Sequence, residues 1–299
     1  MTHESPPQPR SGLAPGVPDR RRNDPAARAE REAFARILAR ITRARGFRIG
    51  DNTLQRLRAV IWERVLVSGA GTAVAYLAQL DDAELAALHD AIAIRETRFF
   101  RVPAQFWLLR DDLLPLLWLR QGRGVQLRLW SAGCATGEEA YSLAMVAIEA
   151  ALRAGASASP PARVIGTDIN AEALAAAQEG LYPLHALGNV PPDLRARYFD
   201  HVGEMFAISP LLRDLTTFQH ADLLAPVWPV ADGSADVIFC QNVLRFLPRD
   251  AVSRVVERLY ATLAPGGYLF LAPGETLPRA RAPFDRVQLP SALFFQKPL

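Results

Sequence analysis

Apolar residues recur with a helical period in the first hundred positions of the chain. The segments AFARILARITRAR (33–45) and TLQRLRAVIWERVLV (53–67) each place apolar residues on one helical face. These residues are Phe34, Ile37, Leu38 and Ile41 in the first segment and Leu54, Leu57, Ile61 and Val65 in the second. A third segment, DDAELAALHDAIA (81–93), begins with aspartates that favour a helix start. We therefore expect a small all-helical domain at residues 29–95.

The pattern changes in the rest of the chain, where short β-type runs alternate with helical ones. The expected strands are LRLW (127–130), RVIGTD (163–168), DLTTFQ (214–219), DVIFC (236–240) and GYLFLA (267–272). Helical sequence lies between them, at 138–154, 171–180 and 249–264. This alternation predicts an α/β domain at residues 96–299 with a parallel, doubly wound sheet. The segment DRVQL…ALFFQK is typical of a final antiparallel pair.

Composition and charge exclude several classes of protein. Residues 1–28 are rich in Pro, Arg and Gly, so we interpret them as a disordered tail. The net charge of +3 is mild, which gives no support for nucleic-acid binding. The sequence lacks a long apolar run of the kind that would predict a membrane-spanning helix. The two cysteines and five histidines lack the spacing of a metal site, and a cytoplasmic location is the expectation.

Candidate chemistry begins at LRLWSAGCATGEEAYSLAM (127–145), where a strand passes into a helix. Gly133 and Gly137 in this junction would let a ligand approach the backbone, and the following helix N-terminus favours an anion. A tight turn that needs glycine for its own geometry is the alternative. The spacing is G-x-x-x-G, which is neither a dinucleotide fingerprint nor a P-loop.

Polar residues follow each of the next expected strands. Asp168 is the last residue of the second expected strand, and Asp222 and Asn242 follow the third and fourth expected strands. Because the carboxyl ends of parallel strands meet at one edge, these residues would share a ligand site, with Asp168 placed to bind ribose hydroxyls. Helix capping and Asx-turns are the alternatives for each residue taken alone. Together the residues predict a nucleoside-binding edge.

Several motifs in the chain resemble the CheR family, the S-adenosylmethionine-dependent methyltransferases of bacterial chemoreceptors. The matching stretches are RETRFFR (95–101), LRLWSAGCATGEEAYSLA (127–144), VIGTDINAEALAAAQEGLY (164–182), ADLL (221–224), DVIFCQNVLRFL (236–247) and LAPGGYLFLAPGET (263–276). The resemblance implies a Rossmann-like class I methyltransferase domain behind a small helical domain. It also implies a small β-subdomain near residues 197–217.

The resemblance implies roles for individual residues. Arg101 would lie near the methionine carboxylate of the cofactor or the acceptor carboxylate, and Phe246 stands where the family has an active-site tyrosine. The cofactor-binding residues would be Arg95, Thr97, Arg101, Gly133, Glu139, Asp168, Asp222, Leu223, Asn242 and Val243. The cofactor would be S-adenosyl-L-methionine, with S-adenosyl-L-homocysteine as its product. No metal is implied.

The chain departs from the family pattern at several of these motifs. The family has Asn at the position of Arg95, and its R-N-V-x-x-Y-F motif reads QNVLRFL at Gln241–Leu247. The family's H-S-E is Pro273-Gly274-Glu275 in this chain. Two hypotheses follow: a protein-glutamate O-methyltransferase, or a catalytically weak or inactive cofactor-binding scaffold.

The resemblance also implies a partner, a chemoreceptor-like helical protein that the enzyme would meet as a monomer. Arg56, Arg58 and Arg64 lie on one expected helix and would face the acidic methylation helices of the receptor. An ordinary solvated helix face is the alternative.

Overall fold

The computed structural model describes residues 25–45, 51–85, 88, 97–122, 125–155, 162–277, 282–290 and 292–299. Its helical part consists of α1 (Pro25–Arg45), α2 (Asp51–Val67) and α3 (Ala73–Gln79). The expected apolar faces form its core, in which Ile37, Ile61 and Val65 are fully buried. Helix α1 begins at Pro25, so the expected tail is too long by four residues at its inner end, because proline is well tolerated in a first helical turn. Leu54 and Leu57 lie outside the side chains described.

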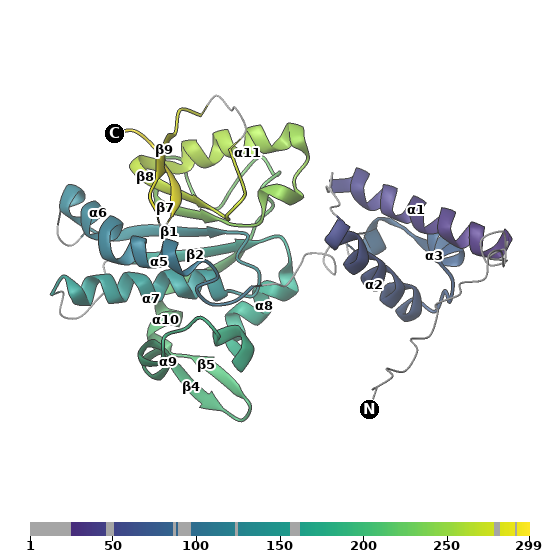
Figure 1. The fold of residues 1–299 in the computed structure, drawn as a ribbon, viewed down its shortest axis with the longest axis horizontal. Helices are drawn as coiled ribbons and strands as arrows, with labels where there is room; N and C mark the ends of the chain where they lie inside the picture. The colour runs from purple at the N-terminus through teal and green to yellow at the C-terminus, as the bar shows by residue number, and fades with distance from the viewer. Residues whose placement is uncertain are drawn as a thin grey trace, which may run out of the picture.

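The larger part is built on a seven-stranded sheet in the order β6-β2-β1-β7-β8-β10-β9 (Figure 1). Its strands are β1 (Leu127–Ala132), β2 (Ala162–Asp168), β6 (Thr216–His220), β7 (Ala235–Cys240), β8 (Leu263–Leu271), β9 (Asp285–Gln288) and β10 (Leu293–Gln296). The first five pair in parallel, and β10 pairs antiparallel with both β8 and β9. The sequence therefore predicted the fold class and the final antiparallel pair correctly.

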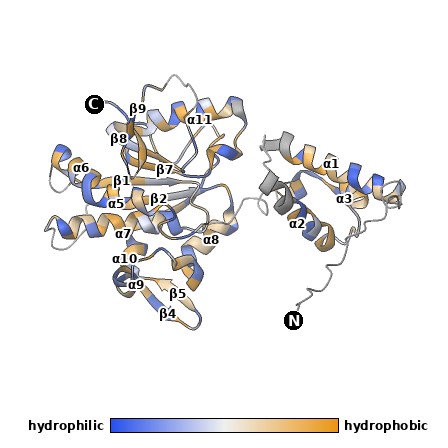
Figure 2. Ribbon diagram, viewed as in Figure 1, coloured by the Kyte–Doolittle hydropathy of each residue, from blue (hydrophilic) through white to orange (hydrophobic). Residues whose placement is uncertain are grey.

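Helices cover both faces of this sheet. They are α5 (Pro103–Leu108), η2 (Leu109–Leu113), α6 (Leu114–Gln121), α7 (Glu138–Arg153), α8 (Ala171–Glu179), α10 (Pro210–Leu215) and α11 (Arg249–Thr262). Along β7, Val237 and Phe239 enter the core beneath α7, whereas Ile238 and Cys240 enter the core on the α11 side. Both faces of β7 are thus buried in apolar cores, which explains its nearly continuous hydrophobic run. Figure 2 shows the hydropathy of each residue along the strands and helices.

A three-stranded antiparallel sheet is inserted before β6. It consists of β3 (Leu181–Pro183), β4 (Phe199–Val202) and β5 (Met205–Ile208), in the order β3-β5-β4, with η3 (Leu184–Leu187) and α9 (Pro192–Tyr198) between the first two strands. The expected subdomain at 197–217 differs from this sheet at both ends. It omits β3, and its last residues belong to α10 and β6 of the larger sheet.

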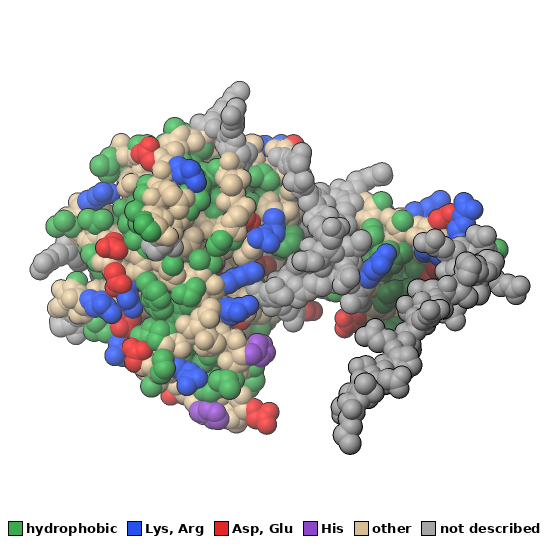
Figure 3. All heavy atoms as spheres, in the orientation of Figure 1, with side chains coloured by type: hydrophobic (Ala, Val, Ile, Leu, Met, Phe, Trp, Pro, Cys, Tyr) green, Lys and Arg blue, Asp and Glu red, His purple; other side chains and the backbone are tan. Residues whose placement is uncertain are grey.

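In the part of the chain that the structure describes, no helix combines the length and apolar character needed to cross a membrane. On the face drawn in Figure 3, basic, acidic and apolar side chains are interspersed over the α/β part.

Candidate functional site at the carboxyl edge of the sheet

The loop after β1 lies against the ends of both neighbouring strands. The amides of Gly133 and Cys134 donate to the carbonyl of Thr167 at 2.7 and 2.9 Å. Gly133 has a φ of +88°, and a Cβ added there would lie 2.3 Å from Cγ2 of Val243. Gly133 is therefore required so that the backbone can approach residue 243, and its contact with a cofactor stays a prediction.

Gly137 has a different structural reason. It precedes α7 with a φ of +95°, and an added Cβ would lie 2.8 Å from Cβ of Ala177. This glycine lets α7 begin close to α8. Both glycines are thus required by the tight strand-to-helix turn itself, which was the alternative to a role in ligand binding. The turn lies at the edge of the sheet where a ligand is expected.

Asp168 joins the loops that follow β1 and β2. Its Oδ2 accepts from the amide of Ala135 at 2.8 Å, and its Oδ1 accepts from the amide of Asn170 at 2.9 Å. Asn170, not Asp168, is the N-cap of α8, because its Oδ1 accepts from the amide of Ala173. The capping alternative for Asp168 is therefore wrong, and its carboxylate lies at the sheet edge as predicted from the strand pattern.

Asp222 forms an Asx-turn, which was the structural alternative to a role in ligand binding. Its Oδ1 accepts from the amide of Leu224 at 2.8 Å, which is an Asx-turn. The side chain is half-buried, and the adjacent Leu223 is buried in the core on the α11 side. A structural role for Asp222 is thus established, and its role in cofactor binding stays a prediction.

Asn242 and Val243 follow β7 in a strained turn. Asn242 has a φ of +61°, and its amide donates to Oε2 of Glu275 at 2.9 Å. In the described part of the chain, the non-glycine residues with positive φ are Asn242, Phe100 and Ala135. All three belong to the motifs that define this edge, and such strain is concentrated at functional sites.

Glu139 is the most perturbed carboxyl group at this edge. Its Oε1 accepts from the hydroxyl of Ser131 at 2.7 Å. Burial raises the pKa of Glu139 to about 7, although the hydrogen bond from Ser131 and the charge of Arg101 lower the pKa. The charge of Glu275 raises this pKa further. Arg101 and Glu275 thus each lie within electrostatic reach of Glu139, although the three residues come from three separate motifs.

The segment before α5 is fixed to α7 through Glu138. The Thr97 side chain hydrogen-bonds the Glu138 side chain, which also accepts from Oγ1 of Thr136 at 2.7 Å. Burial nevertheless raises the pKa of Glu138. The amide of Phe100 donates to Oγ of Ser142 at 3.0 Å. Thr97 therefore anchors the segment that carries Arg101, which is a positioning contact that sequence reasoning had not foreseen.

The two remaining site predictions concern Arg95 and Phe246. Arg95 lies outside the described residues. Phe246 ends the short helix η4 (Leu244–Phe246) and is half-buried; its amide donates to the carbonyl of Val243 at 2.9 Å. The aromatic ring is thus present beside Asn242 and Val243, at the end of β7.

A buried amide pair was missed by sequence reasoning. Nε2 of Gln241 donates to Oε1 of Gln105, and Nε2 of Gln105 donates to the carbonyl of Leu271 at 2.9 Å. Gln105 in α5 thereby connects the ends of β7 and β8. The signal available in the sequence was only a single glutamine within the apolar segment PAQFWL.

Similarity to known proteins agrees with this architecture. A doubly wound sheet with a glycine turn after β1 and carboxylates after β2 and β6 defines a class I S-adenosylmethionine-dependent methyltransferase fold. The family described as "CheR methyltransferase, SAM binding domain" matches residues 95–293. The chain belongs to this family and is an S-adenosylmethionine-dependent methyltransferase of the chemotaxis type.

Several curated proteins are similar over much of their length. Chemotaxis protein methyltransferase 2 of Pseudomonas aeruginosa is 32% identical over 84% of this chain and 88% of that protein. Chemotaxis protein methyltransferase 1 of the same organism is 32% identical over 69% of this chain and 75% of that protein. The probable biofilm formation methyltransferase WspC of Pseudomonas putida is 34% identical over 71% of this chain and 49% of that protein.

Similarity to solved structures is weak by comparison. A SAM-dependent methyltransferase from Methanosarcina mazei is 19% identical over 52% of this chain and 56% of that one, with a TM-score of 0.30.

Proposed function

We propose that this enzyme methylates glutamate side chains of a chemoreceptor-like helical protein, acting as a cytoplasmic monomer. Membership of the CheR family and 32% identity to a chemotaxis protein methyltransferase support this acceptor. The proposal divides the chain into a helical domain at 29–95 and a cofactor-binding domain at 96–299. The observation that carries it is the buried Glu139 carboxyl group beside the end of β1, where it accepts from Ser131 and where the charge of Arg101 lowers its pKa.

The residues at this edge fit the adenosylmethionine cofactor. In this proposal Asp168 accepts hydrogen bonds from the ribose hydroxyls, because an acidic residue at the end of the second strand of such a sheet is placed to bind a ribose. Asp222 and Leu223 flank the adenine, and Asn242 and Val243 form the floor of the pocket. Gly133, Glu139 and Thr97 surround the methionine part. An acidic edge is complementary to a cofactor that carries both an ammonium and a sulfonium charge.

The cofactor supplies an activated methyl group on a sulfonium, so the protein needs no general base for a glutamate acceptor that is already ionised. The work of the chain is to strip water from the acceptor carboxylate and to hold it in line. A guanidinium binds a carboxylate through two parallel hydrogen bonds, and Arg101 is the residue proposed for this task. Phe246 provides an apolar wall without a hydroxyl.

We expect Arg101→Ala to reduce base-labile methyl ester formation on a receptor fragment by about 10- to 100-fold, the scale of losing a charge-assisted contact in the transition state. Arg153→Ala is the matched control, because Arg153 is 60% exposed at the far end of α7. Wild-type turnover in Arg101→Ala would remove the assigned mechanism.

Cofactor binding is tested separately from turnover. Calorimetric titration with S-adenosylhomocysteine is expected to give micromolar binding to the wild type and a large loss in Asp168→Ala. Absence of binding to the wild type would contradict the assignment of the adenosyl pocket.

A second function is favoured by one observation, the ring of Phe246 at the place of the family's tyrosine. A scaffold that binds the cofactor without turnover would show calorimetric binding and no methyl ester on any receptor fragment. In that case Phe246→Tyr is expected to gain turnover, because the hydroxyl would restore one hydrogen bond. Measurable turnover by the wild type would instead remove the scaffold function.

On α2, the helix expected to face the receptor, one of the three arginines has a structural partner. Arg64 does not lie on a free basic face, because it makes a paired contact with Glu84 and its side chain is 29% exposed. Arg58 is exposed, and the side chain of Arg56 lies outside those described. We propose that Arg56 and Arg58 contact the receptor. Unchanged affinity for a receptor fragment after both are reversed to Glu would disprove this contact.

A further inference from the structure

The segment that carries Arg101 contains a strained residue. Phe100, directly before Arg101, has a φ of +50°, in the left-handed region that side chains other than glycine rarely adopt. Its ring is fully buried, with ring centroids 5.3 Å from Phe106 and 4.8 Å from Trp107. A bulky residue keeps this conformation only where its surroundings enforce it, because the strain costs free energy. The contacts that enforce it therefore also determine where Arg101 lies.

Two polar side chains from separate parts of the chain hold the backbone of Phe100. Its amide donates to Oγ of Ser142 in α7 at 3.0 Å, and that hydroxyl donates to the carbonyl of Glu138 at 2.6 Å. The carbonyl of Phe100 accepts from Nδ2 of Asn189 at 3.1 Å. Asn189 lies in the loop between η3 and α9. Both backbone polar groups of the strained residue are thus bound by side chains, which are 42 and 89 residues away in the chain.

The unit that supplies Asn189 also packs against the preceding residue. The amide of Phe99 donates to the carbonyl of Ala186 in η3 at 3.1 Å. The Phe99 ring is fully buried and lies edge-on to the rings of Tyr182 in β3 and Phe199 in β4, with centroids 4.8 and 5.0 Å apart. The small sheet and η3 thus form a packed base from which the carboxamide of Asn189 reaches the segment.

The carbonyl that Asn189 binds belongs to the peptide bond between Phe100 and Arg101. Because a peptide bond is planar, fixing its oxygen and the φ of Phe100 fixes the direction in which the chain enters Arg101. Two residues further on, Pro103 begins α5, which holds the other end of the segment. The half-buried Arg101 is thus fixed at its backbone on both sides, and its long side chain starts from a defined position.

We propose that Asn189 and Ser142 are positioning residues for Arg101, and that they act on methyl transfer through this arginine and not through the cofactor. This inference rests on the proposed function, in which the Arg101 guanidinium holds the acceptor carboxylate in line with the methyl group. A small displacement of the guanidinium then lowers the rate of transfer, because the reaction depends on alignment. Neither positioning residue contacts the reacting atoms, and each acts by holding the backbone of Phe100.

Asn189→Ala removes the donor to the Phe100 carbonyl and leaves Arg101 itself unchanged. Methyl ester formation by the full chain on a receptor fragment is expected to fall by about three- to tenfold, the scale of one lost neutral hydrogen bond. Calorimetric affinity for S-adenosylhomocysteine is expected to stay the same. Gln288→Ala is the matched control with wild-type turnover, because Nε2 of Gln288 donates to the carbonyl of Leu289 at 3.0 Å on the exposed strand β9.

A double-mutant cycle separates positioning from a general loss of stability. If Asn189 acts through Arg101, its substitution has little further effect once Arg101→Ala has removed the guanidinium, because the effects of coupled residues are not additive. We expect the loss caused by Asn189→Ala to shrink to less than about twofold in the Arg101→Ala background. A merely structural role would lower turnover by the same factor in both backgrounds, and urea unfolding measures the change in stability in each.

Ser142→Ala tests the same segment from α7 and keeps the inference testable if Asn189→Ala does not fold. It removes the acceptor of the Phe100 amide, while alanine suits the helix. The same dependence on Arg101 is expected.

The possible failures are distinguishable. Wild-type turnover in either folded variant, an equal fractional loss in both backgrounds, or a loss of S-adenosylhomocysteine affinity as large as the loss of turnover would overturn the inference. Each of these results leaves the proposed function intact. If the wild type formed no methyl ester, or if Arg101→Ala kept full turnover, the proposed function would itself fail, and the positioning of Arg101 with it.

Discussion

The pKa of the Glu139 carboxyl group is determined by the surroundings of this side chain. Glu139 lies in the first turn of α7, is hydrogen-bonded to Ser131 and is within electrostatic reach of Arg101 and Glu275. Burial is the largest influence and raises its pKa from 4.5 to about 7. Because the folded state binds this proton more tightly than the unfolded state, Glu139 lowers stability as pH rises from about 4.5 to about 7. A cationic ligand that favours the ionised form of Glu139 would reduce this loss of stability.

The affinity for S-adenosylmethionine is therefore expected to increase with pH. Between pH 6 and pH 8 the increase is about three- to tenfold, since a bound cation lowers the pKa of Glu139 and binding releases a proton. Calorimetry across this range measures it, and Glu139→Gln is the control with a flat profile. A wild-type profile as flat as that of the variant would show that Glu139 does not contact the cofactor's charge.

Gly133 offers a second prediction for a single residue. Gly133→Ala places a Cβ at positive φ, at a cost of about 1–2 kcal/mol, and also against Val243. Gly71→Ala is the matched control, because Gly71 has a φ of +70° and nothing within 4 Å of an added Cβ. Urea unfolding is expected to show a larger loss for Gly133→Ala. Loss of the same size in both variants would mean that the contact with Val243 is unimportant.

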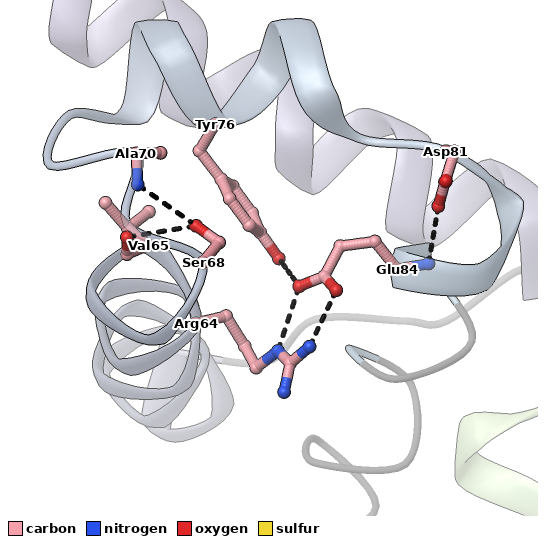
Figure 4. Close-up of polar contacts among 7 residues, drawn as sticks. All are labelled: Arg64, Val65, Ser68, Ala70, Tyr76, Asp81 and Glu84. Atoms are coloured by element: carbon pink, nitrogen blue, oxygen red, sulfur yellow. Dashed lines mark hydrogen bonds and ion pairs between the residues drawn. The ribbon is translucent and has the colours of Figure 1, made fainter.

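At the scale of elements, α2 is joined to the residues after α3 by one polar cluster (Figure 4). Nε and Nη2 of Arg64 donate to the two carboxylate oxygens of Glu84, at 2.9 and 2.6 Å. The Tyr76 hydroxyl donates to Oε1 of Glu84. These contacts hold the pKa of Glu84 below its usual value. Their contribution to stability is thus present above the unfolded pKa of 4.5 and is lost as pH falls through the lowered value.

Arg64→Ala is expected to destabilise the helical part by about 1–3 kcal/mol, because the Glu84 carboxylate loses both guanidinium contacts. Arg28→Ala is the control, since Arg28 pairs with Glu32 on an exposed face and should change stability by less than about 0.5 kcal/mol. Hydrogen exchange of α2 and α3 in the full chain measures the effect. Equal protection in the two variants would show that the cluster carries no net stabilisation.

Elements with a long apolar period were predictable, whereas short ones were not. β1, β7 and β8 were recognised because both of their faces are buried, and α7 because it repeats its apolar face over sixteen residues. β3 has only three residues, of which Tyr182 alone is buried, so it is too short to show the alternating pattern of a strand. The sequence position of the small sheet was consequently misjudged at both ends.

At the scale of the whole molecule, the sequence predicted that the ends of these strands share one edge of the sheet, but not the connections across that edge. Asp168 and Asn242 follow strands and could be recognised for that reason. The contacts of Gln105 with Leu271, and of Glu275 with Asn242, join segments that only the folded sheet brings together. Such pairings depend on strand order, which local patterns do not contain.

The strand order also has a consequence for folding of the protein. β8 ends at Leu271, and its partner β10 begins only at Leu293, after β9. The edge of β8 that faces β10 is therefore free in any intermediate in which this last strand pair has not yet formed. A free strand edge can pair with strands of other molecules, so a substitution that weakens the contact between β8 and β10 should increase aggregation during refolding.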